Sequence, residues 1–140
     1  MPQAILPELY VSSIERSLDF YLDVIGFSVR YDRPEERFAY LQLDGAALMI
    51  EQTVTLERTF VAAELSYPFG RGMNLSITVP SVNAVHERVL AHGNRIFLPL
   101  EERWYRQDAG EVGNRQFVVM DPDGYLLRII GDLGTRALTV

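Results

Sequence analysis

The chain repeats one order of secondary structure, and this repeat limits the fold more than any other feature of its 140 residues. Hydrophobic periodicity predicts a strand over 4–11, a helix over 12–25 and three strands at about 28–33, 38–43 and 46–52. The second half repeats this order, with a strand over 74–79, a helix over 81–93 and strands at about 96–100, 115–120 and 126–130. Two βαβββ modules must pair to bury their sheets, which predicts an α+β fold with a cupped, eight-stranded mixed sheet and helices on its outer side.

Local signals recur along with the elements. Ser13 matches Ser81, Gly26 matches Gly93, and the hairpin signal Asp44-Gly45 matches Asp123-Gly124. We expect Ser12 and Glu15 to cap the first helix as a capping box and Gly26 to end it. The chain is therefore predicted to be one domain over 1–140, with module one at about 4–52, a connection at about 53–72 and module two at about 73–132.

Composition excludes several kinds of function. The chain has no cysteine and no lysine, which removes disulfides, thiolate nucleophiles and Schiff-base lysines. A net charge of −6 and the lack of a basic run argue against nucleic acid and favour a cationic ligand. No apolar run is long enough to cross a membrane, and the first residues lack the pattern of a signal peptide, so a cytoplasmic location is expected.

Strand alternation predicts which side chains line the cup. Residues two apart on a strand share a face of the sheet. The predicted cup residues are Leu6, Glu8 and Tyr10, then Ala47, Met49 and Glu51, then Asn74, Ser76 and Thr78, and finally Leu126, Arg128 and Ile130. Arg128 can clamp an anionic group or pair with a carboxylate, and Glu8 and Glu51 can hold a cation or an amine.

The duplicated pattern, with "VSSIERSLDFYLDVIGF" early and "FVVMDPDGYLLRII" late, resembles the vicinal oxygen chelate superfamily of glyoxalases, bleomycin resistance proteins and dioxygenases. Two motifs carry the likeness, S-x-x-F-Y at 17–21 and D-P-D-G at 121–124. The resemblance implies that metal enzymes of this group would place their ligands at Leu6, Met49, Asn74 and Arg128. None of these side chains suits a hard divalent ion, so no metal and no cofactor are expected.

Within that superfamily the chain is most similar to bleomycin resistance proteins, through "LDGAALMIEQ" and "GNRQFVVMDPDGYLLRII". The resemblance implies a metal-free binding protein that sequesters a cationic, bleomycin-like drug in a groove between two subunits, a role in antibiotic resistance without catalysis. Pro7 matches a proline in the first strand of such proteins, which implies a homodimer with an exchanged N-terminal strand. Their drug-stacking tryptophan corresponds to Val112 and Gly113 here, so Trp104 would have to substitute.

The candidate ligand-binding residues are Glu8, Met49, Glu51, Asn74, Arg128, Phe38, Tyr40, Trp104 and Tyr105, and no catalytic residue is predicted. Phe38 and Tyr40 share a face, so both lie in the core or both in the cup. Trp104 and Tyr105 either stack on a flat ligand or pack over the sheet edge.

Two enzymatic alternatives stay open at this point. One is a divalent-metal glyoxalase-like lyase or extradiol-dioxygenase-like enzyme, and the other is metal-free catalysis with Glu8 or Glu51 as general base. His86 and His92 lie on the second predicted helix, which places them away from the cup. The segment 67–72, "YPFGRG", can cover the cup or anchor the connection, and we favour the anchor.

Overall fold

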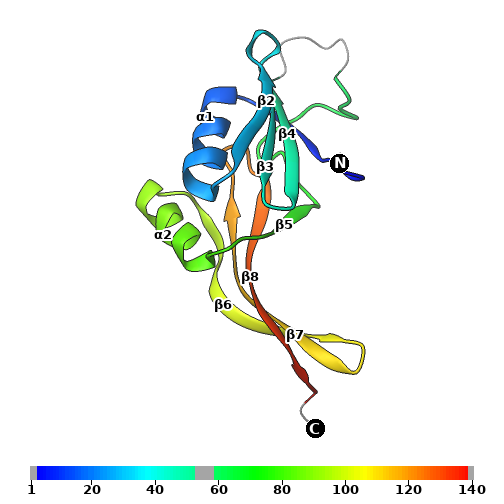
Figure 1. The fold of residues 1–140 in the computed structure, drawn as a ribbon. Coiled ribbons are helices and arrows are strands. Elements are labelled where there is room, and N and C mark those ends of the chain that lie inside the picture. Colours follow the sequence, from blue (N-terminus) through cyan, green and yellow to red (C-terminus); the bar gives the residue numbers. More distant parts are fainter. Residues whose placement is uncertain (1–2, 53–58, 139–140) are drawn as a thin grey trace.

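The computed structural model describes residues 3–52 and 59–138, which form two βαβββ modules (Figure 1). Module one contains β1 (Glu8–Val11), α1 (Ile14–Leu18), the π-helical segment η1 (Asp19–Ile25), β2 (Ser28–Arg33), the 3-10 turn η2 (Pro34–Glu36), β3 (Phe38–Leu43) and β4 (Ala46–Gln52). Module two contains β5 (Asn74–Thr78), α2 (Val82–His92), β6 (Ile96–Gln107), β7 (Gly110–Met120) and β8 (Leu126–Ala137). The predicted order of elements is confirmed in both halves.

The eight strands are divided between two four-stranded sheets. Sheet A has the order β1-β4-β3-β2 and sheet B the order β5-β8-β7-β6. In each sheet the first and last strands of the module pair in parallel and the other pairs are antiparallel, so both sheets are mixed. The α+β class is confirmed, and the eight predicted strands form two sheets with the same topology.

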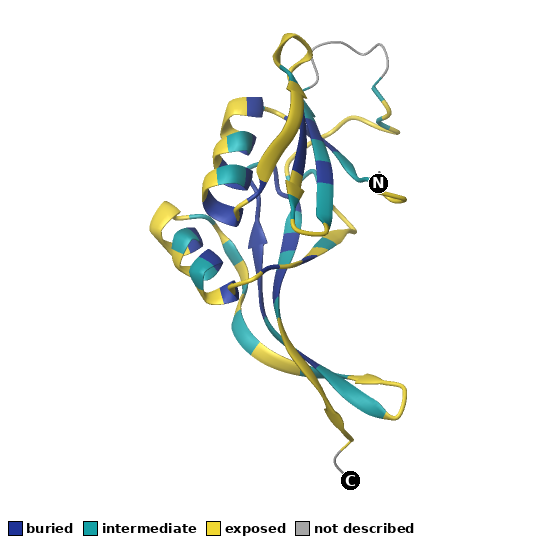
Figure 2. Ribbon diagram, in the orientation of Figure 1, coloured by how far each residue is buried: buried dark blue, intermediate teal, exposed yellow. Residues whose placement is uncertain are grey.

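One hydrophobic core joins the modules, and the helices cover only one face of each sheet (Figures 1 and 2). Ile50 and Leu41 of sheet A, Phe117 and Ile129 of sheet B, and Tyr21 of η1 are all fully buried in this cluster. Burying a side chain of this size stabilises the fold by about 1.5–3 kcal/mol. The opposite face of each sheet, which we call its open face, carries none of the helices in the described residues (Figure 1).

The helix ends follow the sequence signals with one correction. Ser81 caps α2 by accepting a hydrogen bond from the Ala84 N–H, and Gly93 ends it in the left-handed region at φ 71°. In module one the cap is Ser13, whose hydroxyl accepts from the Arg16 N–H at 3.3 Å, and the predicted cap Ser12 is wrong. Ser12 lies one residue further from the helix and binds another element instead. None of the helices that the structure describes is long and apolar enough to cross a membrane.

Strands β6, β7 and β8 continue far beyond their predicted ends. Prediction ended β6 at 100 and β8 at 130 and began β7 at 115, whereas the strands reach Gln107, Ala137 and Gly110. These extensions project from the body as a three-stranded arm, residues 101–114 and 131–137 (Figure 1). The arm is missed by periodicity because its sequence, "EERWYRQ", is polar on both faces and buries no apolar stripe.

The connection between the modules is fixed to the turn between β7 and β8. The Phe69 N–H donates to the Asp123 carbonyl at 2.8 Å, and the Phe69 ring packs edge-on against Tyr125 at 6.2 Å. Gly70 leaves no room for a side chain, because a Cβ there would lie 2.8 Å from the Tyr125 backbone. The predicted anchoring role of 67–72 is therefore confirmed. Residues 53–58 of the predicted connection lie outside the described residues.

Candidate functional site

The strand registers show which positions of the two modules are equivalent. In module one Glu8 pairs with Met49, and in module two Ser76 pairs with Arg128. Met49 and Arg128 are therefore matched. Counting back two residues from Glu8 and Ser76 matches Leu6 with Asn74, as the sequence repeat predicts, but Leu6 precedes β1, because this strand begins at Glu8 and not at residue 4 as predicted.

These four positions do not fit a divalent cation. A leucine and a methionine offer no hard oxygen donor, an arginine is protonated and repels a cation, and the single amide oxygen of Asn74 does not make a metal site alone. The Arg128 Nε group is committed as a donor to the Ser76 hydroxyl at 3.0 Å. In the portions of the chain that the structure describes, no three histidine, cysteine, aspartate or glutamate side chains gather closely enough to hold a metal ion.

The open face of sheet A carries an aromatic wall. The registers place Phe38 and Tyr40 of β3 on the same face as Met49 and Glu51 of β4, opposite the core residues Ala39 and Leu41. An irregularity in β2 brings Tyr31 beside Tyr40, where the rings stack with centroids 5.1 Å apart. Phe38 and Tyr40 therefore belong to the cup face.

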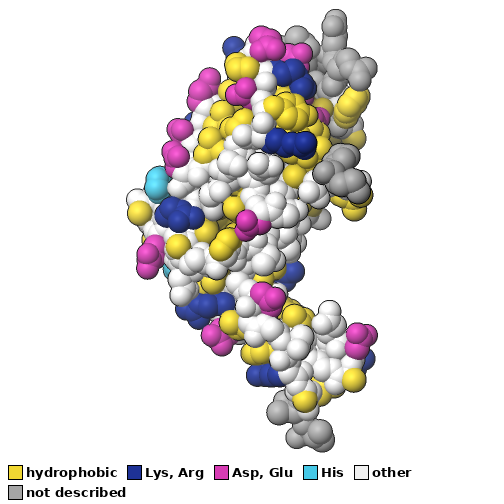
Figure 3. All heavy atoms as spheres, in the orientation of Figure 1, with side chains coloured by type: hydrophobic (Ala, Val, Ile, Leu, Met, Phe, Trp, Pro, Cys, Tyr) yellow, Lys and Arg dark blue, Asp and Glu magenta, His cyan; other side chains and the backbone are white. Residues whose placement is uncertain are grey.

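Arginines cover part of this wall. The Arg33 guanidinium lies 4.0 Å from the centre of the Phe38 ring, and Arg30 lies 5.2 Å from that of Tyr40. Figure 3 shows arginine side chains against hydrophobic ones over β2–β4. Phe38 and Tyr40 are only 4% and 5% exposed, whereas Tyr31 is 44% exposed and is the accessible ring of the wall.

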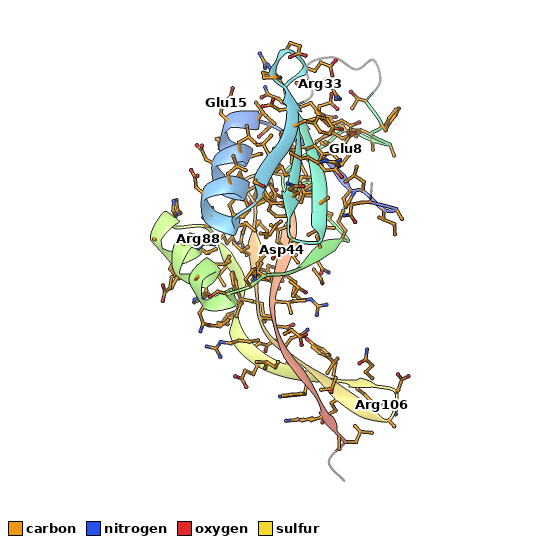
Figure 4. All side chains as sticks on the ribbon, in the orientation of Figure 1. Glu8, Glu15, Arg33, Asp44, Arg88 and Arg106 are labelled. Carbon is orange, nitrogen blue, oxygen red and sulfur yellow. The ribbon has the colours of Figure 1, made fainter. Side chains whose placement is uncertain are left out.

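Two carboxylates lie beside the aromatic wall. Glu8 on β1 and Glu51 on β4 face the same side of adjacent strands, and Figure 4 shows Glu8 and Arg33 on sheet A. Burial raises the pKa of the Glu51 carboxyl, and the negative charges of Glu8 and Glu36 raise it further, whereas Arg33 opposes the rise. This pair of half-buried carboxylates can stabilise a cation placed between them.

A cavity of about 640 Å³ opens at the end of β1, next to this face. Its wall includes Tyr10, Ser12, Val61, Leu65 and Phe69. The Tyr10 hydroxyl accepts a hydrogen bond from the Phe60 N–H at 3.0 Å, which joins the connection to the open face of sheet A. The volume is in the range of small-molecule sites. None of the predicted ligand-binding residues lines it, because the connection had no periodic signal to place it.

The open face of sheet B is centred on Arg128. The Tyr105 ring lies 5.9 Å from the Arg128 guanidinium carbon, and the Tyr105 hydroxyl accepts from the Gln116 side chain at 2.6 Å. Asn74 lies on the same face of β5 as Ser76. The structure thus places Asn74, Arg128 and Tyr105 on one open face and brings the last two into contact. Arg128 makes no ion pair with Glu8 or Glu51, and within residues 3–52 and 59–138 no hydrogen bond, ion pair or ring contact joins the side chains of the two open faces.

Trp104 lies on the other face of the arm, away from the remaining candidates. It pairs with Gly113, and a Cβ on Gly113 would lie 2.6 Å from the indole ring, so the ring rests on the glycine backbone. The Arg136 guanidinium covers the ring at 4.0 Å. On the same face as Trp104, the Arg115 Nε group donates to Asn83 of α2 at 2.9 Å. This face is therefore the helix side of the sheet, opposite Arg128. Trp104 and Tyr105 therefore do not form one stacking site within the chain.

The two histidines are on α2, as predicted. His86 packs edge-on against the core residue Phe117, with ring centroids 5.0 Å apart, and His92 contacts the Arg88 carbonyl at 2.8 Å. Both side chains are on the helix side of sheet B, away from the open faces.

The motif residues form a polar seam between the modules. The Tyr21 hydroxyl of the S-x-x-F-Y motif donates to the Asp121 carboxylate of the D-P-D-G motif at 2.7 Å. Ser12 donates through its N–H and hydroxyl to Asp123, at 3.0 and 2.5 Å. Burial raises the pKa of Asp121, and its hydrogen bonds, first the one from Tyr21, oppose the rise. Sequence reasoning missed this pairing, although two motifs whose polar residues lie within apolar runs are a signal of buried polar contacts.

The repeated modules and their matched strand positions define a duplicated βαβββ protein. Residues 4–129 match the model of the Glyoxalase/Bleomycin resistance protein/Dioxygenase superfamily. The chain belongs to this superfamily.

The chain is also similar to several solved structures. A superfamily member from Vibrio splendidus 12B01 is 37% identical, with 91% of this chain and 97% of that one covered and a TM-score of 0.40. A protein of unknown function from Agrobacterium tumefaciens str. C58 is 26% identical over 95% of this chain and 96% of that one, with a TM-score of 0.70. The fosfomycin resistance protein FosX of Listeria monocytogenes shares the fold, at 16% identity, coverage of 94% and 93%, and a TM-score of 0.59. No curated protein matches the chain.

Proposed function

We propose that the protein is a metal-free small-molecule-binding protein of the bleomycin-resistance type, which sequesters a flat, cationic ligand without catalysis. The observation that carries the proposal is the position of two carboxylates, Glu8 and Glu51, on the same open face as the aromatic wall, whose accessible ring is Tyr31. Carboxylates attract a cation, and aromatic rings bind a flat cation through both stacking and charge. The overall charge of −6 favours the same ligand.

The proposal includes a homodimer whose groove lies between the subunits. The open faces of sheets A and B carry opposite charged groups, Glu8 and Glu51 on one and Arg128 on the other, and a second copy can place the two faces on opposite walls of one groove across a twofold axis. The segment before β1 is exposed, with Ile5 at 84% exposure, so it is available to cross to a partner around Pro7. Asn74, Met49 and Tyr105 would then line the same groove, whereas Trp104 would join it only from the partner's arm.

A binding assay with two flat or drug-like cations tests the ligand class. Purified protein is titrated with bleomycin and with proflavine, and the melting temperature is followed because a ligand that binds only the folded state raises it. We expect a saturable rise with at least one cation and its loss in the double variant Glu8→Gln/Glu51→Gln. Glu35→Gln, an exposed carboxylate of η2, is the matched control and should behave like the wild type.

Metal analysis of the same preparation separates the proposal from an enzymatic alternative. Stoichiometric divalent metal, retained after dialysis and required for cation binding, would overturn the proposal. A rise in melting temperature that persists in the Glu8/Glu51 double variant would overturn the assignment of the binding face. Fractionation of expressing cells tests the cytoplasmic location that the sequence predicts.

A further inference from the structure

Arg128 is a half-buried cation without a carboxylate partner. The ion pairs in the described part of the chain join Arg33 to Glu36, Arg115 to Glu102 and Arg136 to Glu111, and Arg128 takes part in none of them. The centre of sheet B is an unusual place for an unpaired arginine, because a charge held against apolar surface loses hydration. A counter-charge from outside the chain would offset that loss.

The guanidinium is held in a fixed orientation. Its Nε group donates to the Ser76 hydroxyl at 3.0 Å, and the Tyr105 ring lies beside its carbon atom at 5.9 Å. Within residues 3–52 and 59–138, neither of its two Nη groups has a hydrogen-bond partner. These two groups form the planar fork that binds both oxygens of a carboxylate.

The surroundings favour an oxyanion. The strand neighbours of Arg128 include the buried Val118, and an apolar floor strengthens the attraction between the guanidinium and an anion. The Ser76 and Tyr105 hydroxyls each accept a hydrogen bond from the protein, so their own protons are free to be donated. The carboxylate of Glu101 accepts from Gln116 at 3.2 Å and forms no ion pair with Arg128.

We propose that the open face of sheet B is a binding site for a flat carboxylate, with Arg128 as its bidentate anchor and Ser76 and Tyr105 as flanking donors. The Tyr105 ring extends the site with a surface on which a flat ligand stacks. The site lies on a different sheet from the cation-binding face proposed above. It stands whether or not that face binds a cation.

Benzoate is the probe that tests this site, and benzamide is its uncharged counterpart. Titration of each into isotopically labelled protein at low salt, followed by nuclear magnetic resonance, should show saturable binding of benzoate and none of benzamide. Arg128→Gln should weaken benzoate binding by about tenfold or more, because it removes a charge-assisted bidentate contact. Arg106→Gln, an exposed arginine at the end of the arm (Figure 4), is the matched control and should bind benzoate as the wild type does.

Two results would overturn the proposal. One is benzoate binding of equal strength in wild type and Arg128→Gln. The other is the absence of saturable benzoate binding to the wild type. If Arg128→Gln and Glu51→Gln then also lose self-association, by sedimentation velocity, the guanidinium pairs with a carboxylate of a second copy instead of a small molecule.

Discussion

At the scale of single residues, the polar side chains divide into those that hold the modules together and those that face outward. Tyr21, Asp121, Ser12 and Asp123 connect elements about a hundred residues apart in the sequence and lie on the core side. Glu8, Glu51 and Arg128 lie on the open faces and make few contacts. The family motifs therefore report on the fold, and the residues that would select a ligand lie outside them.

Removing the Tyr21 hydroxyl should destabilise the protein. Tyr21→Phe deprives the buried Asp121 carboxylate of one donor, and we expect a loss of about 1–3 kcal/mol in the free energy of unfolding. Urea unfolding at neutral pH measures it. Tyr67→Phe, which removes only a hydrogen bond to the weakly accepting Met120 sulfur from a tyrosine that is 55% exposed, should change the free energy by less than about 0.5 kcal/mol. Equal free energies of unfolding for the two variants would show that the Tyr21–Asp121 hydrogen bond does not stabilise the protein.

Neutralising Glu51 should stabilise the protein in a pH-dependent way. Because burial and Glu8 raise the pKa of Glu51 in the folded state, its ionised form costs stability above that pKa. Glu51→Gln should therefore be more stable than wild type near pH 7, by less than about 1 kcal/mol in the free energy of unfolding. This difference should disappear as the pH falls below the range of ordinary carboxyls. Melting temperatures from pH 4 to 8 test this, with Glu35→Gln as control. A constant difference across that range would contradict the assignment.

At the scale of elements, the sequence predicts the helices and strands that have hydrophobic periodicity and misses the segments that lack it. Helix α2 is predicted closely because Val82, Val85 and Val89 form one buried stripe between the signals Ser81 and Gly93. The first helix is present, but its second half widens into the π-helical segment η1, which no local signal marks. Glu8, Met49, Asn74 and Arg128 are placed on open faces by alternation alone. Alternation does not place Trp104, because its strand lies in the arm, which is polar on both faces.

Filling the space at Gly113 should disturb the arm. An added Cβ would meet the Trp104 ring at 2.6 Å, so Gly113→Ala must displace the indole from its place under Arg136. Trp104 is the one tryptophan of the sequence, so its fluorescence reports on the arm directly. We expect a red-shifted emission and a loss of about 1–3 kcal/mol in stability.

Gly45→Ala provides the comparison for this variant. A Cβ at Gly45 meets nothing within 4 Å, so its emission spectrum should match that of the wild type. An unchanged spectrum in Gly113→Ala would mean that the arm already holds the indole away from the glycine.

At the scale of the whole molecule, the outward-facing charged side chains are divided between the two open faces. The hydrophobic core is continuous across the modules, but the acidic face of sheet A and the arginine face of sheet B share no polar contact within the described residues. The proposed twofold dimer would place both faces on the walls of one groove.

The proposed dimer should be sensitive to Ile5. Sedimentation should give a mass near twice the 15.9 kDa of the chain, and Ile5→Ser should weaken association roughly tenfold, the effect of exposing one large apolar side chain. Leu90→Ser removes another exposed apolar side chain, on the outer surface of α2, and should leave association unchanged. A monomer at all concentrations, or equal effects of the two variants, would contradict this arrangement of subunits.

The Tyr21–Asp121 contact lies on the far side of each sheet from the residues that would meet a ligand. Mutations at the ligand-facing positions can therefore accumulate without breaking the joint between the modules. Proteins with this architecture can change their ligand while they keep their fold. Sequence similarity at the joint between the modules therefore identifies the fold, whereas the ligand is selected by residues outside the joint.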